Sequence, residues 1–336
     1  MIKVAAYTGG LDVPSARYRV RQLIPALQRN HIQIKEYRSP ISVYPPKQKL
    51  LRPFWGAGVL LSRSASVVAG YQADVTLLQR EMLSTLVSLE PFTKSPRVLD
   101  VDDAIFLFRE GRAAKKLAEL SEHVICGNEF LAEKFNQWNK QMSIVPTAVD
   151  TTKYVPKKLV TEKKIIGWMG TSGNFSYLYK IAPALEKILT SRSDGVFRIV
   201  SDQRPEFNSK LDQFVDYIKW TPANEVEQLQ SMTVGLMPLE DGEWERGKCS
   251  FKMLQYMACG VPTVVSPVGM NRQVLALGDS GFFANTETEW VDRISDFLDN
   301  EKLRTEFGSK GREVVEQHFS HEIIATKLTD VLKKVI

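Results

Sequence analysis

The sequence predicts an α/β protein with two domains, each built on a parallel sheet that helices cover on both faces. The chain has 336 residues, which is enough for two hydrophobic cores of ordinary size. Short apolar runs alternate with longer amphipathic runs along most of its length, as in parallel α/β sheets. A polar connector with lysines and prolines, residues 146–164, interrupts this alternation near the middle.

The first half predicts one domain over residues 1–148. Short apolar runs indicate strands, and apolar residues spaced by three and four positions indicate helices. The expected strands are 2–8, 32–38, 75–79, 97–102, 123–128 and 143–146. The expected helices are 15–30, 112–122 and 128–138.

The second half predicts another domain over residues 149–318, followed by one closing amphipathic helix. The expected strands are 164–170, 197–202, 217–220, 234–239 and 262–267. The expected helices are 177–192, 224–232, 251–258, 290–300, 301–316 and 321–336. Ligands of such sheets bind beyond the carboxyl ends of the strands, so candidate site residues are sought there.

The composition is that of a soluble globular protein, with 43% hydrophobic and 25% charged residues. No apolar run reaches 18 residues, so no membrane-spanning segment is expected. The N-terminus MIKVAAYTGG is a strand followed by glycines rather than a signal peptide, so we expect a cytoplasmic protein. Three cysteines, Cys126, Cys249 and Cys259, form no CxxC pair, and neither a disulfide framework nor a zinc site is expected.

Positive charge gathers at the N-terminus. Residues 1–63 contain 11 Lys/Arg and 2 Asp/Glu, a net charge of +9, although the whole chain carries only +5. An anionic partner follows from this excess: a phosphorylated acceptor, an anionic membrane surface or nucleic acid. A solvated basic face is the alternative, and no recognised nucleic-acid motif is present. Residues 47–69 interleave cations with large apolar residues, which fits either a membrane surface or a buried helix with a basic rim.

The first loop, residues 7–19, runs from a strand through Gly9 and Gly10 towards a helix. Backbone amides at such a turn favour an anion or a sugar hydroxyl. Arg17 and Arg19 add positive charge. The alternative interpretation is a tight turn with solvated arginines.

Three carboxylates, Asp100, Asp102 and Asp103, stand at the end of an apolar strand in LDVDDAIF. Active-site groups often occupy this position. The D-V-D spelling also matches the D-x-D pattern that holds a divalent metal and a nucleotide diphosphate. A third interpretation is an aspartate that caps the following helix.

A second glycine loop, IIGWMGTSGNFSYL, again joins a strand to a helix. Gly170, Thr171 and Ser172 place backbone amides and hydroxyls at the helix start, which suits a phosphate. The loop is not a Walker loop, because the required lysine pattern does not occur.

The stretch KCSFKMLQYMACG places Lys248 and Lys252 four residues apart, where both can face one side of a first helical turn. Lysines oppose the macrodipole at a helix N-terminus, and a bound anion resolves that conflict. Cys249 and Ser250 offer amides to the same anion, and Gln255 can hydrogen-bond a ribose hydroxyl. Alternatively, the lysines only offset the acidic residues of the preceding loop.

Two segments resemble the family 4 glycosyltransferases of the GT-B fold. IVPTAVDTTKY (144–154) is similar to the family's interdomain connector, and LQYMACGVPTVVSPVG (254–269) is similar to "lEAMAcGvPVvas..G". PSARYR, DVDDAIF, GWMGT and GKCSFKMLQYMA together look like a bacterial surface-polysaccharide subgroup. The resemblance covers nearly the whole chain.

The resemblance implies two Rossmann-like domains whose parallel sheets face each other across a cleft. It implies retaining transfer of a sugar from a nucleotide-diphosphate sugar to a glycan or lipid-linked acceptor, with no metal or other cofactor. The first domain would bind the acceptor and the second the donor, and a closing helix, 319–336, would pack back on the first domain. The alternative function is a non-catalytic protein that binds nucleotide sugars or polyanions.

The resemblance also assigns residues. The family's ribose-binding glutamate corresponds to Gln255, and its sugar-contacting glutamate falls at Gly247, so Glu245 or Glu243 takes that role. Asp102 or Asp103 stands near the place of the family's N-domain histidine.

The candidate site residues fall into three groups. The catalytic candidates are Asp102, Asp103, Lys252 and Glu245. The donor-binding candidates are Gly170, Thr171, Ser172, Lys248, Cys249, Ser250, Phe251 and Gln255. The acceptor-binding candidates are Gly9, Gly10, Arg17 and Arg19. The sugar, the base, the acceptor and the oligomeric state stay open.

Overall fold

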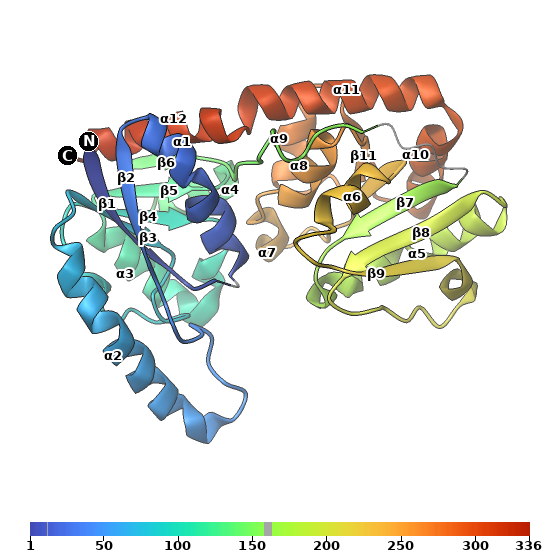
Figure 1. Ribbon diagram of the computed structural model, residues 1–336. Helices are drawn as coiled ribbons and strands as arrows, with labels where there is room; N and C mark the ends of the chain where they lie inside the picture. The colour runs from blue at the N-terminus through green and yellow to red at the C-terminus, as the bar shows by residue number, and fades with distance from the viewer. Residues whose placement is uncertain (12, 158–162) are drawn as a thin grey trace. The chain divides into compact units, whose positions relative to one another are not determined.

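The computed structural model describes residues 1–11, 13–157 and 163–336 and divides the chain into two compact units (Figure 1). Unit 1 comprises Met1–Ala148, Arg246–Cys249 and His321–Ile336, and unit 2 comprises Val149–Glu245 and Ser250–Ser320. Asp12 of the first glycine loop and residues 158–162 of the predicted connector lie outside the described residues.

Unit 1 is built on a six-stranded sheet in the order β2-β1-β3-β4-β5-β6, in which all neighbouring strands are parallel. The strands are β1 Ile2–Thr8, β2 Ile32–Arg38, β3 Val75–Gln79, β4 Arg97–Val101, β5 His123–Cys126 and β6 Met142–Ile144. All six were predicted from the sequence, with differences of a few residues at their ends.

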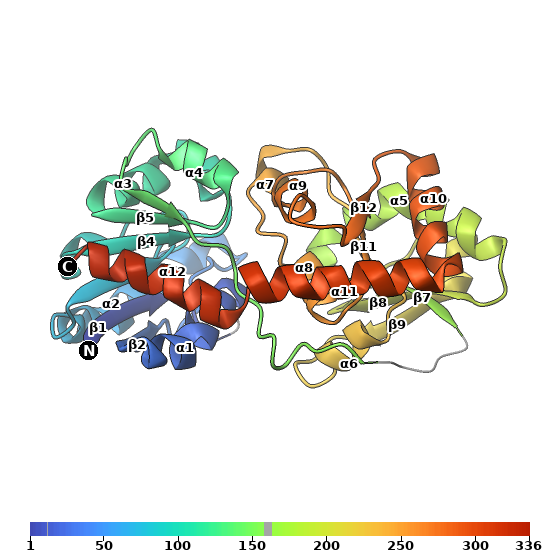
Figure 2. The same cartoon turned by 90° about the horizontal axis from the view of Figure 1, so that it is seen from above.

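Helices cover both faces of this sheet. Val4 and Ala6 of β1 belong to a core with α1 (Ile24–Arg29) and α12 (His321–Lys334). The alternate residue Tyr7 faces α2 (Arg52–Gly70), where its hydroxyl donates to the Ser66 carbonyl at 3.1 Å. Because successive strand residues point to opposite faces, α2 lies opposite α1 and α12 (Figure 1). Figure 2 shows α12 running along the sheet of unit 1.

The helix predicted over residues 15–30 is broken into three pieces. A π-helical turn, Ala16–Val20, is followed by a 3₁₀ turn, Arg21–Leu23, and then by α1. Pro25 lies in the first turn of α1, where its missing N–H does no harm, whereas it would interrupt a continuous helix. The other helices of unit 1 are η3 Lys49–Leu51, η4 Glu90–Phe92, η5 Ile105–Gly111, α3 Arg112–Leu120 and α4 Glu129–Phe135.

Unit 2 contains a second parallel sheet in the order β12-β11-β10-β7-β8-β9. Its strands are β7 Lys164–Met169, β8 Gly195–Ser201, β9 Val215–Lys219, β10 Val234–Met237, β11 Thr263–Val265 and β12 Gly281–Phe283. The three-residue strand β12 was not predicted, because a run that short carries no periodicity. The predicted α/β class, with one parallel sheet in each domain, is confirmed.

One face of this sheet packs against α5 (Phe175–Thr190) and α10 (Glu287–Asp299), which share a core with its strands. The other face receives α8 (Phe251–Ala258). A Cβ atom on Gly235 of β10 would lie 2.5 Å from the Tyr256 ring, so only glycine lets α8 approach so closely. The other helices are η6 Ser172–Asn174, η7 Lys210–Phe214, α6 Glu225–Gln230, α7 Glu243–Arg246, α9 Met270–Leu275 and α11 Glu301–His318.

Each sheet has one place where the strand order reverses. This topological switch point lies between β1 and β3 in unit 1, and between β7 and β10 in unit 2. Open parallel sheets bind ligands beyond the carboxyl ends of the strands at such points. Within the described residues, the helices are all too short or too polar to span a bilayer.

Candidate functional site

The switch point of unit 2 brings the second glycine loop and the first turn of α8 together. A Cβ atom on Gly170 would lie 2.4 Å from the Trp168 ring and 3.0 Å from Cε of Lys252, so the absence of a side chain permits this packing. The Lys252 ammonium lies 6.0 Å from the centroid of the Trp168 ring, within reach of a cation–π contact. Gly170 and Lys252 therefore lie close together in unit 2.

The amides of this loop are less available than the sequence suggested. The Gly170 amide donates to the Val200 carbonyl at 3.0 Å, and the Ser172 amide donates to Asp202 at 2.7 Å. The Ser172 hydroxyl also donates to Asp202, at 2.8 Å. Both amides already have acceptors inside the domain, and the phosphate contact predicted for them stays a prediction. The Thr171 hydroxyl accepts a hydrogen bond from Asn174.

Glu245 lies at the same switch point, in the segment that follows β10. The hydroxyl of Tyr177, on the first turn of α5, donates to the Glu245 carboxylate. A second link between the same elements is the ion pair of Lys180 and Glu240, at 2.7 Å. Burial and the neighbouring Glu245 carboxylate both raise the pKa of Tyr177, so its hydroxyl stays protonated as a donor.

Gln255 is buried inside unit 2. It is 4% exposed, and its amide nitrogen donates to the Tyr154 hydroxyl at 3.0 Å and to Glu225 at 3.3 Å. Tyr154 also donates to Glu225, which accepts another hydrogen bond from Trp220 at 3.0 Å. The ribose contact predicted for Gln255 stays a prediction, and in this structure the side chain hydrogen-bonds a buried carboxylate.

Lys248 lies before the helix and does not share its first turn with Lys252. Helix α8 starts at Phe251, and Ser250 precedes it in a left-handed conformation with φ 49°. The residue pair was therefore wrongly placed on one helical turn. Lys248 belongs to unit 1, where the Asn128 side chain donates to its carbonyl at 3.0 Å.

The neighbours of Lys248 are also engaged. The Cys249 thiol donates to the Asp102 carbonyl at 3.2 Å, and the Ser250 hydroxyl donates to Asn271 at 2.7 Å. A Cβ atom on Gly247 would lie 2.9 Å from the Ala104 nitrogen. This close approach explains in physical terms why glycine stands at this position, where a glutamate side chain would collide with the backbone.

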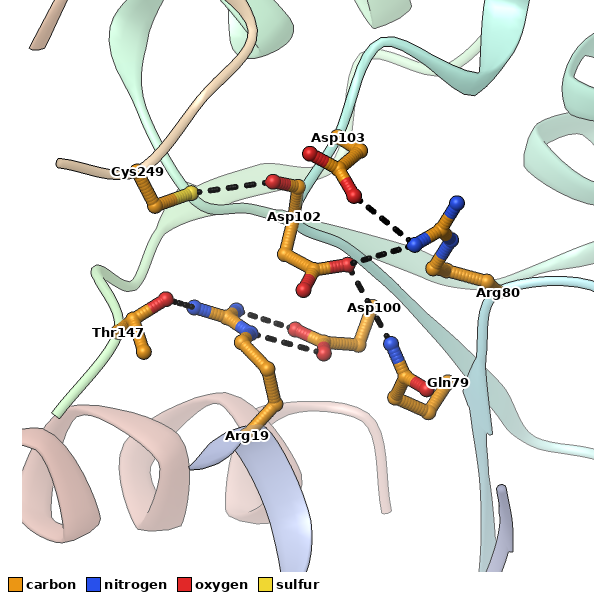
Figure 3. Close-up of polar contacts among 8 residues, drawn as sticks. All are labelled: Arg19, Gln79, Arg80, Asp100, Asp102, Asp103, Thr147 and Cys249. Carbon is orange, nitrogen blue, oxygen red and sulfur yellow. Dashed lines mark hydrogen bonds and ion pairs between the residues drawn. The ribbon is translucent and has the colours of Figure 1, made fainter. Parts of the chain in front are cut away.

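In unit 1, Arg19 and Asp100 form a buried ion pair that closes the carboxyl end of β4 (Figure 3). Both side chains are nearly inaccessible, with 3% and 6% exposure. The guanidinium of Arg19 also donates to the Val145 carbonyl at 2.8 Å and to the Thr147 hydroxyl. The donors of Arg19 are used within the domain, and the acceptor contact predicted for it stays a prediction.

Asp102 and Asp103 share a second arginine. Arg80 lies 3.7 Å from Asp102 and 3.0 Å from Asp103, and the Gln79 amide donates to Asp102 at 3.4 Å (Figure 3). Asp102 and Asp103 keep 12% and 29% exposure, so the two carboxylates border accessible space, unlike Asp100. Arg80 itself adopts a left-handed backbone conformation, φ 62°, which is uncommon outside glycine and often marks functional sites.

The pKa of Asp102 is raised from its ordinary value of 3.8 to about 7. Burial is the largest cause, and the nearby Asp103 carboxylate acts in the same direction. Arg80 and Arg19 act in the opposite direction without reversing the shift. The carboxyl group therefore exchanges its proton near neutral pH. Such a group can hydrogen-bond a substrate hydroxyl either as donor or as acceptor.

Gly9 and Gly10 directly follow β1, at the switch point of unit 1. Gly10 has φ 139°, a conformation that favours glycine, and its carbonyl accepts a hydrogen bond from Arg21 at 3.1 Å. Arg21 also pairs with Glu36 at 2.9 Å. The Arg17 guanidinium lies 4.9 Å from the centroid of the Tyr18 ring. The acceptor role predicted for Gly9, Gly10 and Arg17 stays a prediction.

The D-x-D interpretation finds no support in the geometry, because both carboxylate oxygens of Asp100 accept hydrogen bonds from Arg19. Across residues 1–11, 13–157 and 163–336, no group of three or more His, Cys, Asp and Glu side chains is arranged to hold a metal ion.

Residues 163–300 match the model of the family described as "Glycosyl transferases group 1". This segment resembles a group 1 glycosyl transferase domain. It covers most of unit 2, including the glycine loop, Glu245 and Lys252. The resemblance seen in the sequence is thereby confirmed.

The chain is also similar to individual proteins of known sequence or structure. The chain is 24% identical over 217 residues to the N-acetyl-alpha-D-glucosaminyl L-malate synthase of Bacillus anthracis, covering 59% of this chain. The match spans about half the length of that relative, 55%. Sucrose-phosphate synthase of Thermosynechococcus elongatus superposes with a TM-score of 0.78, 15% identity and 99% coverage of each chain. HepE of Anabaena, solved with UDP-glucose, superposes with a TM-score of 0.73, 13% identity, and 99% and 100% coverage.

Sequence reasoning missed several residues around the second glycine loop and in unit 1. Tyr177 and Asp202 hold Glu245 and Ser172, and Arg80 holds the carboxylates of unit 1. Asp202 directly follows strand β8, so the strand-end rule that singled out Asp102 also applies to it. No sequence signal marks Tyr177, which lies on an amphipathic helix among other aromatic residues.

Proposed function

We propose that the protein is a retaining glycosyltransferase that moves a sugar from a nucleotide-diphosphate sugar to a glycan or lipid-linked acceptor in bacterial surface polysaccharide synthesis. The observation that carries this proposal is the match of residues 163–300 to the group 1 glycosyl transferases. HepE, which has the same fold, was solved with UDP-glucose, which supports a nucleotide sugar as the donor. The proposed place of action is the cytoplasm or the inner face of the plasma membrane.

Lys252 is proposed to stabilise the leaving diphosphate. As the bond from the sugar to the β-phosphate breaks, negative charge develops on the phosphate oxygens. The Lys252 side chain lies beside Gly170, and its ammonium lies 6.0 Å from the centroid of the Trp168 ring, at the switch point of unit 2. A fixed positive group at such a position contributes about 2–4 kcal/mol to transition-state stabilisation. Lys248 is proposed as a second phosphate contact.

Glu245 is proposed to hold a hydroxyl of the donor sugar. Its carboxylate is anchored by Tyr177 on the helix that follows the glycine loop. One hydrogen bond leaves further acceptor capacity on a carboxylate, which offers about four lone-pair positions. The anchor fixes the carboxylate's orientation, and fixed orientation is what discriminates one sugar hydroxyl from another.

Asp102 and Asp103 are proposed to orient the acceptor hydroxyl in unit 1. Both carboxylates are held by Arg80 and remain partly exposed. The pKa of Asp102, about 7, keeps a fraction of the ionised form at neutral pH, and that form accepts a hydrogen bond from a hydroxyl group.

An anionic membrane is the proposed location of a lipid-linked acceptor. Phe54, Leu61 and Val68 are seven residues apart on α2, so they share one face, and they are 78%, 76% and 73% exposed. Lys47, Lys49 and Arg52 surround its start, and residues 37–73 contain no acidic side chain. An exposed apolar stripe with cations at one end fits an anionic bilayer surface. Binding to phosphatidylglycerol vesicles, but not to phosphatidylcholine vesicles, is expected, and a Phe54→Ser/Leu61→Ser variant should lose it.

A thermal-shift screen of nucleoside diphosphates and their sugars tests donor binding, because a ligand of the folded state raises the unfolding temperature. Transfer or hydrolysis of the donor that binds then separates an enzyme from a non-catalytic binder, which would bind without turnover. Activity is expected to persist in a chelator; its loss would favour a metal-dependent mechanism.

A further inference from the structure

A cavity of about 540 Å³ opens in unit 1, between the segments that follow β3 and β4. One wall is the segment after β3, with Thr85 and Leu86, and the other is the segment after β4, with Arg109, Glu110 and Arg112. These strands are neighbours in the sheet, and their following segments start at Arg80 and Asp102, which form an ion pair. The cavity therefore belongs to the sheet edge at which we place the acceptor.

Both walls are held in place by hydrogen bonds. Glu90 is fully buried, and its carboxylate accepts from the backbone amides of Met82 and Ser88, which fixes the wall after β3. The Nε atom of Arg109 donates to the Thr85 hydroxyl at 3.1 Å, which joins the two walls. The contact uses one of the five N–H groups of this guanidinium.

The backbone around the cavity is strained. Thr85, Arg109 and Glu110 have φ angles of 64°, 50° and 58°, the left-handed region that non-glycine residues rarely adopt. Three such residues line the same cavity. Conformations of this kind persist where the surrounding structure enforces them, and they gather at ligand sites.

The charge of the cavity favours an anion. Arg109 and Arg112 oppose a single carboxylate, that of Glu110, and Arg112 is the first residue of α3, where the helix dipole adds positive potential. Arginine binds phosphate and carboxylate groups in a forked geometry. The ion pair of Arg112 and Glu110, at 2.6 Å, is 79% and 77% exposed, so a bound anion can displace it at little cost.

We propose that this cavity binds a phosphate or carboxylate group of the acceptor, and hence that the acceptor is an anionic sugar or sugar phosphate. The inference rests on the proposed function, because it gives the acceptor of that reaction a chemical class. Arg109 and Arg112 hold the anionic group, and Asp102 and Asp103 at the head of the same segment contact the hydroxyl that receives the sugar.

Calorimetric titration of the full-length protein tests the proposal, with UDP at saturation so that the phosphate sites for the donor are filled. The probes are glucose 6-phosphate, glucuronate, methyl glucoside and inorganic phosphate. The two anionic sugars should bind at least about tenfold more tightly than methyl glucoside and than inorganic phosphate. Equal affinity of the anionic and neutral sugars would overturn the proposal, as would inorganic phosphate binding as tightly as glucose 6-phosphate.

Variants assign the binding to the cavity. Arg109→Gln and Arg112→Gln should each weaken glucose 6-phosphate about tenfold, whereas Arg29→Gln, an equal charge change on α1, should leave it unchanged. Glu110→Gln removes the competing carboxylate and should tighten binding, a gain that misfolding cannot produce. An unchanged or weaker affinity in Glu110→Gln contradicts the proposal.

The release of nucleoside diphosphate from a nucleotide sugar, measured without acceptor, reports on the proposed function alone. Donor turnover together with no preference for anionic sugars would contradict only the acceptor class. Absence of donor turnover and donor binding would instead contradict the proposed function.

Discussion

The Nη1 atom of Arg80 lies 3.7 Å from Oδ1 of Asp102, yet the pKa of Asp102 remains raised to about 7. Burial of the carboxylate therefore outweighs the attraction of the arginine, which is divided between Asp102 and Asp103. This balance makes Asp102 a group whose charge changes near neutral pH. It also makes the stability of unit 1 depend on pH in a defined direction.

Asp102 should make folding less favourable as pH rises. The folded protein holds this proton up to about pH 7, whereas the unfolded chain loses it near the ordinary value of 3.8. The folded state binds more protons in this window, so the free energy of unfolding contributed by Asp102 is fully present below about pH 4 and is lost as pH rises through about 7. The free energy of unfolding of Asp102→Asn, relative to that of the wild type, should therefore be roughly 2–3 kcal/mol higher at about pH 8 than at about pH 5.

Urea unfolding at both pH values measures this difference, with Asp330→Asn, an exposed aspartate on α12, as the matched control. A gain that is the same at both pH values would show that Asp102 has no raised pKa. The pH profile of turnover provides a second readout, because a limb that rises through about pH 7 should disappear in Asp102→Asn.

The two parallel sheets could be predicted because most of their strands are short apolar runs between helices. Such runs can be recognised from the local sequence without knowledge of tertiary contacts. The breaks in the chain were harder to foresee. Lys248 and Lys252 have helical spacing, but Ser250 adopts a left-handed conformation between them, and sequence spacing does not reveal that. The sequence does not distinguish the aspartates at the end of β4 from one another. In the structure, Asp100 is buried in an ion pair with Arg19, whereas Asp102 keeps some exposure.

Gln255 offers a direct test of its structural role. Gln255→Ala should destabilise the protein by about 1–3 kcal/mol, because a buried donor to Tyr154 and Glu225 is lost, while the affinity for UDP should stay unchanged. Gln255→Glu should be worse than alanine at neutral pH, because it places a second carboxylate beside the buried Glu225. Loss of UDP binding in Gln255→Ala at unchanged stability would instead support the ribose role.

Gly170 and Gly173 are a matched pair in one loop. Gly170→Ala would bring a Cβ atom to 2.4 Å from the Trp168 ring, whereas a Cβ atom on Gly173 meets nothing within 4 Å. Gly170→Ala should therefore cost about 1–3 kcal/mol and displace Lys252, with loss of turnover. Gly173→Ala should be neutral or slightly stabilising. Equal effects of the two substitutions on unfolding temperature would contradict the packing described here.

The most direct test of the central claim is the turnover of nucleotide sugars by Lys252→Ala. Nucleoside diphosphate release from the donor found by thermal shift is measured for the wild type, for Lys252→Ala and for Lys252→Arg, with Lys302→Ala, an exposed lysine on α11, as the control. Loss of about 2–4 kcal/mol of transition-state stabilisation predicts a decrease of about 30- to 1000-fold in Lys252→Ala, partial recovery in Lys252→Arg and wild-type turnover in Lys302→Ala. Wild-type turnover in Lys252→Ala, or no turnover of any nucleotide sugar by the wild type, would contradict the account.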